Sequence, residues 1–174
     1  MEHNIIKTYT GERVNVTAPN QRKIHIEDIA HALSVIPRYN GHYPRILTVA
    51  EHCLNVVKQV EKRSDCTPRM KMHALLCNAS EAYLCNLPRP IKKAMKGYWG
   101  FEQEFMDAIL HRYGVDEGEY LEIIDAADTT VSETEETVWA NWSENRTHGK
   151  TRSEIKKEFI DKYYSIAQTM KYDK

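Results

Sequence analysis

The chain has 174 residues, of which 41% are apolar and 28% are charged, a composition typical of one globular domain. Its 24 lysines and arginines are balanced by 25 aspartates and glutamates, which argues against a protein that coats long nucleic acid. There is no apolar run of the roughly 18 residues that a membrane span needs, so we expect no membrane partner. The first residues do not read as a signal peptide and the four cysteines show no CxxC spacing. We therefore expect a cytoplasmic protein with reduced thiols.

The pattern predicts a single domain over residues 1–174, with a β-hairpin in residues 1–20 and a helical core in residues 21–174. The hairpin is indicated by alternating β-branched and polar residues around Thr10, Gly11 and Glu12. Helical periodicity follows over residues 26–36, 49–60, 68–84, 91–95, 99–114, 118–140 and 152–170. Two capping boxes, Thr48 with Glu51 and Thr151 with Glu154, mark helix starts. The fold class is therefore all-α.

Several polar residues lie inside otherwise apolar helical stretches. They are His52, Cys77, Asn78, Glu81 and Asp128. Taken singly, each is most simply a hydrogen-bonded core group, because buried polar atoms are normally satisfied. Their occurrence on several helices instead favours a common site, although spacing alone does not bring them together.

Four stretches of the sequence resemble a known family. They are IEDIAHALSVIPRYNGH, LTVAEHCLNV, HALLCNASEAYLCNLPRPIKKAM and the AAD that ends at Asp128. Over residues 5–136 the chain resembles the HD-domain phosphohydrolases, in particular the small bacterial and phage 5′-nucleotidase-like and dNTP-hydrolysing proteins. The resemblance implies a compact HD-domain helical bundle that assembles as a homo-oligomer.

Members of that family hold a divalent metal with a His, a His-Asp pair and a distant Asp. By the resemblance, His52 and Asp128 match the first and last ligands, whereas Cys77 and Asn78 replace the central pair. Glu81 matches the residue that orients the attacking water, and Asn86 replaces a catalytic acidic residue. Since a neutral amide is a poor ligand for hard cations, we expect no metal and no efficient catalysis. Zinc held by His52, Cys77 and Asp128 is the alternative, and manganese is the other metal considered.

A pocket without its metal could still bind a phosphate. Candidate contacts are the cations Arg38, Arg89, Lys92, Lys93 and Lys96, although for the three lysines a solvated helix face is the simpler interpretation. By the resemblance, Tyr39 could stack on a base, or it could simply pack in the core. His42 lies in the following turn and could line the same opening. The acidic residues 132–136 are expected to form a solvated face, and Trp99, Trp139 and Trp142 to pack in the core or at a subunit interface.

These substitutions lead to one leading hypothesis and two alternatives. The leading hypothesis is a catalytically disabled HD-fold protein that binds a nucleotide or a nucleotide-derived signal, such as a cyclic oligonucleotide, without hydrolysing it. Such a binder could act as a phage-type sponge against host defence signalling. The first alternative is an active nucleotide phosphohydrolase with an altered ligand set. The second is a protein-interaction module with a vestigial pocket.

Overall fold

The computed structural model describes residues 3–143 and 149–171, and it begins with the expected hairpin. Strand β1 (Ile5–Lys7) pairs antiparallel with β2 (Arg13–Asn15), with Ile6 opposite Val14. Gly11 turns the chain between them with a φ of 92°, a conformation that glycine adopts without steric cost. The side chain of Val14 is fully buried, so the hairpin is attached to the core by its second strand.

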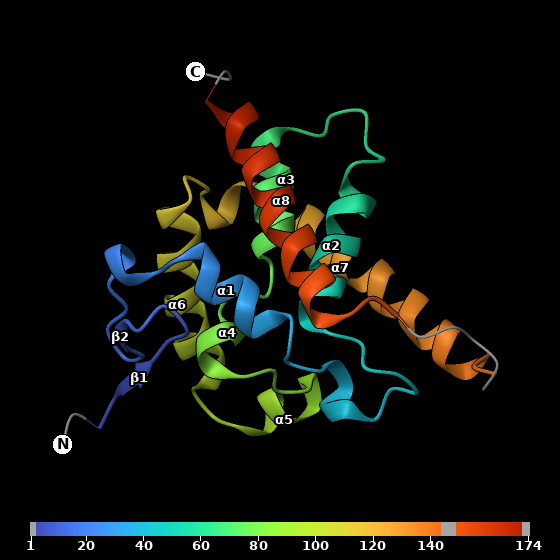
Figure 1. Ribbon diagram of the computed structural model, residues 1–174, viewed down its shortest axis with the longest axis horizontal. Coiled ribbons are helices and arrows are strands. Elements are labelled where there is room, and N and C mark those ends of the chain that lie inside the picture. Colours follow the sequence, from blue (N-terminus) through green and yellow to red (C-terminus); the bar gives the residue numbers. More distant parts are fainter. Residues whose placement is uncertain (1–2, 144–148, 172–174) are drawn as a thin grey trace.

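The other described elements are helical. In chain order they are η1 (Gln21–Lys23), α1 (Ile26–Leu33), η2 (Arg38–Gly41), α2 (Val49–Val60), α3 (Pro68–Leu76), α4 (Glu81–Leu84), α5 (Arg89–Ala94), α6 (Tyr98–Arg112), α7 (Glu117–Ala140) and α8 (Arg152–Met170) (Figure 1). The all-α class with a short hairpin is confirmed, while the HD-domain bundle stays a prediction. None of the helices in the described ranges is both long and apolar enough to cross a membrane.

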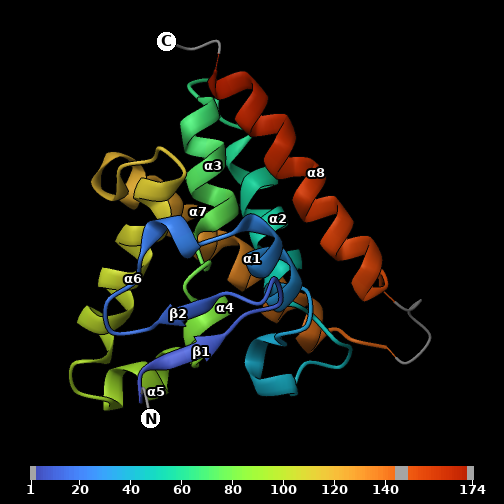
Figure 2. The same ribbon diagram turned by 60° about the vertical axis from the view of Figure 1, so that its left-hand side comes forward.

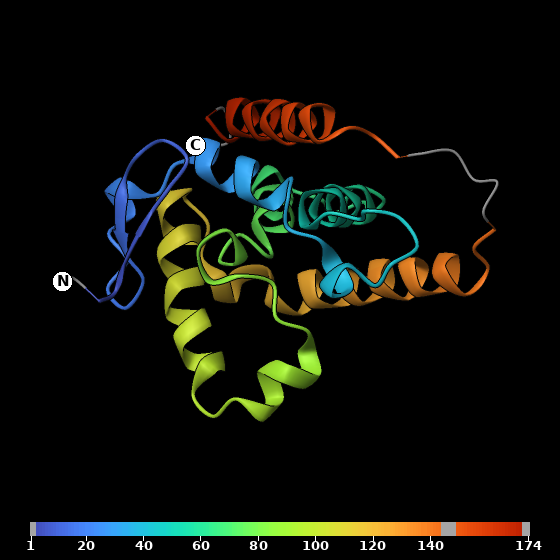
Figure 3. The ribbon, with the colours of Figure 1, turned by 60° about the horizontal axis from the view of Figure 1, so that its bottom comes forward.

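The helices form layers around one apolar core. Helices α2 and α3 lie between α8 on one side and α7 on the other, and α1 packs beneath α8 (Figure 3). Helix α6 and the hairpin close one end of this stack (Figure 2). The core residues Phe105 and Phe159 are fully buried, and they come from α6 and α8. Helices α2 and α3 therefore form the centre of the fold, with α8 packed on one face of the pair and α7 on the opposite face.

Helix starts follow the predicted caps. The Thr48 hydroxyl accepts from the Glu51 backbone N–H at 3.2 Å, while the Glu51 carboxylate accepts from the Thr48 N–H at 2.9 Å. Thr151 and Glu154 form the same reciprocal pair at the start of α8. Thr67 caps α3 ahead of Pro68, as expected. These capping signals depend only on residues close in the sequence, so they can be recognised without knowledge of the tertiary structure.

The prediction of one continuous helix over residues 68–84 is wrong. Helix α3 ends at Leu76, and α4 begins only at Glu81. Between them the backbone bonds span three residues, from Ala79 N to Leu76 O at 2.9 Å and from Glu81 N to Asn78 O at 3.1 Å. This tight turn means that Cys77 and Glu81 do not lie one above the other on a single helix face.

A buried carboxylate joins the hairpin to the core. Asp28 on α1 is 3% exposed, and its two oxygens accept from the Thr10 N–H at 2.7 Å and from the Thr10 hydroxyl at 2.9 Å. The hairpin turn is thus held on the helix by one bidentate contact.

We expect Asp28→Ala to lower the free energy of unfolding by about 2 kcal/mol, because hydrogen bonds to a charged group are the strong ones and the Thr10 donors lose them. Glu104→Ala, an exposed acid on α6, is the control and should change stability by less than about 0.5 kcal/mol. Urea denaturation measures both. Equal effects of the two variants would contradict the assigned contact.

Candidate functional site

A cavity of about 800 Å³ opens beside α7. Its wall comes from η2, the α3–α4 turn, the segment entering α5, and one face of α7. Nine residues singled out from the sequence line it, namely Arg38, Tyr39, His42, Asn78, Glu81, Asn86, Arg89, Lys92 and Asp128. The sequence analysis thus named most of this wall, but four of its candidates, His52, Cys77, Lys93 and Lys96, are not among the lining residues, and both lysines are exposed.

The centre of the site is a buried histidine held between two carboxylates. His52 on α2 is fully buried, and its Nε2 lies 2.6 Å from Asp128 Oδ1. Its Nδ1 lies 2.9 Å from Glu135 Oε1. Both carboxylates come from α7, so the three groups join α2 and α7 through one chain of hydrogen bonds.

Glu135 was missed, and the expectation that residues 132–136 form a solvated face is wrong at this position. Glu135 is 6% exposed, and its Oε2 accepts from Arg38 Nε at 2.8 Å and from the Tyr39 hydroxyl at 3.0 Å. Ser132 also faces inward and accepts from Arg38 at 3.1 Å. The sequence did contain a signal, because Glu135 follows Asp128 by seven residues, which is two turns on the same helical face.

The charges of this centre are mutually stabilised. Burial alone would lower the pKa of His52, but the hydrogen bonds to Asp128 and Glu135 raise that pKa to about 9. Burial would raise the pKa of Asp128 and of Glu135, but the hydrogen bonds from His52 lower both. At neutral pH the structure therefore holds an imidazolium between two carboxylates.

The opposite wall contains a second network. The Asn86 amide donates to Glu81 Oε2 at 2.7 Å, and Lys92 Nζ lies 2.7 Å from Glu102 Oε1 and 3.5 Å from Glu81 Oε1. Burial raises the pKa of Glu81, although the nearby Lys92 charge opposes this. Asn86 and Lys92 thus have partners within the protein. Arg89 also has a partner, since it donates to Asp128 Oδ2 at 2.8 Å, but unlike Lys92 its side chain is 69% exposed.

The backbone is strained where η2 enters the cavity wall. Tyr39 and Asn40 have φ values of 54° and 51°, a left-handed conformation that is costly for residues with a Cβ atom. The Tyr39 ring packs edge-on against Trp139 with centroids 5.4 Å apart. Both residues line the cavity. Such strain persists only where surrounding contacts enforce it, and it clusters at ligand sites.

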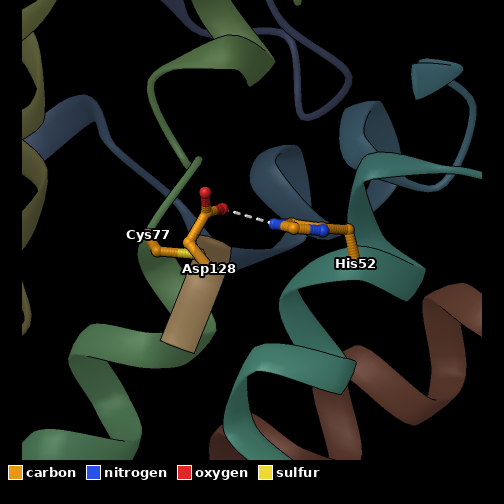
Figure 4. Close-up of side chains that lie close together, drawn as sticks. All are labelled: His52, Cys77 and Asp128. Atoms are coloured by element: carbon orange, nitrogen blue, oxygen red, sulfur yellow. Dashed lines mark hydrogen bonds and ion pairs between the residues drawn. The ribbon is translucent and has the colours of Figure 1, made fainter. Parts of the chain in front are cut away.

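Three neighbouring side chains have the chemistry of metal donors, and of these Asp128 lines the cavity. His52, Cys77 and Asp128 place one ligand atom each within 4.8 Å of one another (Figure 4). In Figure 4 the Asp128 carboxylate turns toward His52, and Cys77 lies on its other side. Burial and the neighbouring Cys53 thiol, 3.9 Å away, raise the pKa of Cys77 well above its usual value. A thiol, an imidazole and a single carboxylate supply only one hard oxygen donor group, so the set does not fit a hard divalent cation.

No family model matches this chain. It is similar to the uncharacterized protein YfdR of Escherichia coli, with 31% identity over 115 residues that make up 64% of this chain and 60% of YfdR. It is also similar to the uncharacterized protein RCAP_rcc00048 of Rhodobacter capsulatus, with 33% identity over 111 residues, 61% of this chain and 56% of that protein. The chain thus matches less than two thirds of the length of either relative.

We expect the His52 imidazole to stay protonated at pH 7 and to titrate near pH 9 in NMR spectra of its ring nitrogens. Because this pKa is raised above the unfolded value, its contribution to stability is fully present below about pH 6.5 and is lost as the pH rises through 9. A neutral His52 at pH 7 would contradict the assigned ion pairs.

Proposed function

We propose that this protein binds a nucleotide or a nucleotide-derived signal in an HD-type helical bundle and does not hydrolyse it. The proposal is carried by one observation, which is a cavity lined by an exposed arginine, an aromatic pair and an aspartate that is itself ion-paired to a buried histidine. The volume of about 800 Å³ lies in the range of small-molecule sites.

The phosphate of the ligand would be bound by Arg89. Its guanidinium carries five N–H donors and is largely exposed, so it can turn from Asp128 toward an oxyanion. Arg38 is less available, because it is 14% exposed and fixed by Glu135 and Ser132. The Asn40 and Asn78 amides line the same cavity and can donate hydrogen bonds without adding negative charge.

The base of the ligand would lie against Tyr39 and Trp139. Tyr39 stands 5.4 Å from Trp139 between ring centroids, and both residues line the cavity. Aromatic rings stack on all nucleobases, so this part of the cavity contributes affinity but no specificity for one base. The strained backbone at Tyr39 supports a role in ligand binding over plain packing.

Turnover is disfavoured by the donor set. Hydrolysis in the family that the sequence resembles needs a cation to polarise the phosphate and to acidify a water. Here Asn78 is neutral, the Cys77 thiol is protonated, and His52 is engaged on both ring nitrogens. A protein that binds a signalling nucleotide without cleaving it lowers the free concentration of that signal. We propose that it does so as a homo-oligomer in the cytoplasm, for example as a phage-type protein that sequesters a signal of a host defence pathway.

We expect Arg89→Ala to weaken binding of nucleoside monophosphates by tenfold or more, because charge-assisted contacts contribute about 1.5–3 kcal/mol. Arg63→Ala removes an exposed arginine paired with Asp65 and is the matched control. Isothermal titration calorimetry measures both variants and the unmodified chain. If no nucleotide binds even at millimolar concentration, the interaction module is favoured instead. Phosphate release by the unmodified chain that EDTA abolishes would favour the hydrolase.

The double change Cys77→His, Asn78→Asp should create Mn²⁺ binding, because it adds an imidazole and a carboxylate beside His52 and Asp128. Asn86 is left in place, since an aspartate there would face the buried Glu81 carboxylate. Metal analysis after dialysis gives the stoichiometry, with the unmodified chain as control. A double variant without manganese would contradict the proposed alignment of this turn with the metal-binding pair.

A further inference from the structure

A second cavity of about 440 Å³ adjoins the first. It lies among the α3–α4 turn, α6 and the first half of α7, and its wall includes Trp99, Gln103 and Leu121. The two cavities share four lining residues, namely Asn78, Arg89, Lys92 and Asp128. They are therefore neighbouring spaces separated by a thin wall of side chains.

The movable part of this wall is a single ion pair. Arg89 NH2 donates to Asp128 Oδ2 at 2.8 Å, and Arg89 is 69% exposed. Asp128 has a second partner in His52, so it remains paired if Arg89 turns away. Because the Arg89 side of the pair is largely exposed, solvent screens it, and a phosphate can take over the guanidinium while Asp128 stays paired with His52.

The second cavity has an aromatic and an aliphatic side chain at its edge, and its wall also contains the carboxylates of Glu102, Asp125 and Asp128. Trp99 is 68% exposed and Leu121 is 43% exposed, so an aromatic and an aliphatic side chain are both accessible at its edge. Gln103 and Ser80 add polar groups to the wall. His73 also lines it; it is 3% exposed, and its Nδ1 has no hydrogen-bond partner within the described residues. Burial lowers the pKa of His73 to about 4, so this wall carries no positive charge there at neutral pH.

We propose that the two cavities form one bipartite site for a dinucleotide, an inference that rests on the proposed function. One base lies against Tyr39 and Trp139 in the larger cavity, and the other lies against Trp99 in the smaller one. The phosphodiester that links them is bound by Arg89 at the shared wall. An aromatic position in each cavity and one exposed guanidinium that lines both favour this ligand over a mononucleotide, which would leave the smaller cavity and Trp99 unused.

The test compares ligands of equal charge. The probes are the 3′–5′ dinucleotides ApA, GpG, CpC and UpU, each with the 5′-methylphosphate of the same nucleoside, which also carries one phosphodiester charge. Calorimetry should show at least one dinucleotide binding tenfold or more tightly than its mononucleotide, since stacking of a second base adds affinity.

Variants assign this advantage to the second cavity. Trp99→Ala should weaken dinucleotide binding about tenfold and change the affinity for the methylphosphate less than twofold. Tyr164→Ala, an exposed aromatic on α8, is the control and should change neither. Because Trp99 is largely exposed, its removal should leave the fold intact, which circular dichroism verifies.

The outcomes separate the two proposals. If the methylphosphates bind but no dinucleotide binds more tightly, or if Trp99→Ala preserves the dinucleotide advantage, the bipartite site is wrong and nucleotide binding stands. If neither class of probe nor any nucleoside monophosphate binds, both proposals are overturned.

Discussion

The site depends on a row of alternating charges that is largely buried from Arg38 through Glu135 and His52 to Asp128 and ends at the exposed Arg89. Desolvating such groups is costly, and only close partners of opposite charge on each side offset that cost. The row joins η2, α2, the start of α5 and α7, which are far apart in the sequence. Removing one inner member would leave an uncompensated buried charge, so the row fixes the relative positions of these elements.

The same row determines how a ligand can be recognised. Arg38 has its guanidinium committed to Glu135 and Ser132, and Lys92 is committed to Glu102. An incoming anion thus meets a wall whose cations are already neutralised, and it must compete with Asp128 for Arg89. A diffuse attraction to any anion is therefore not expected, and affinity must arise from shape and stacking together with this one exchange.

Local signals in the sequence were sufficient for much of the fold. The capping boxes at Thr48 and Thr151 and the turn at Gly11 depend on neighbouring residues, and all three are present. The break after Leu76 was not predictable from periodicity, because the apolar pattern continues through it into α4. Glu135 lies in an acidic run that resembles a solvated surface, and its burial depends on His52, 83 residues away.

Helix α7 contributes Asp128, Ser132, Glu135 and Trp139 from one face, at intervals of about one turn. An inserted or deleted residue between Asp128 and Glu135 would rotate the following part of the helix by about 100° relative to the preceding part. One carboxylate would then leave His52 while the other stayed. We therefore expect homologous chains that retain this centre to keep the length of this segment.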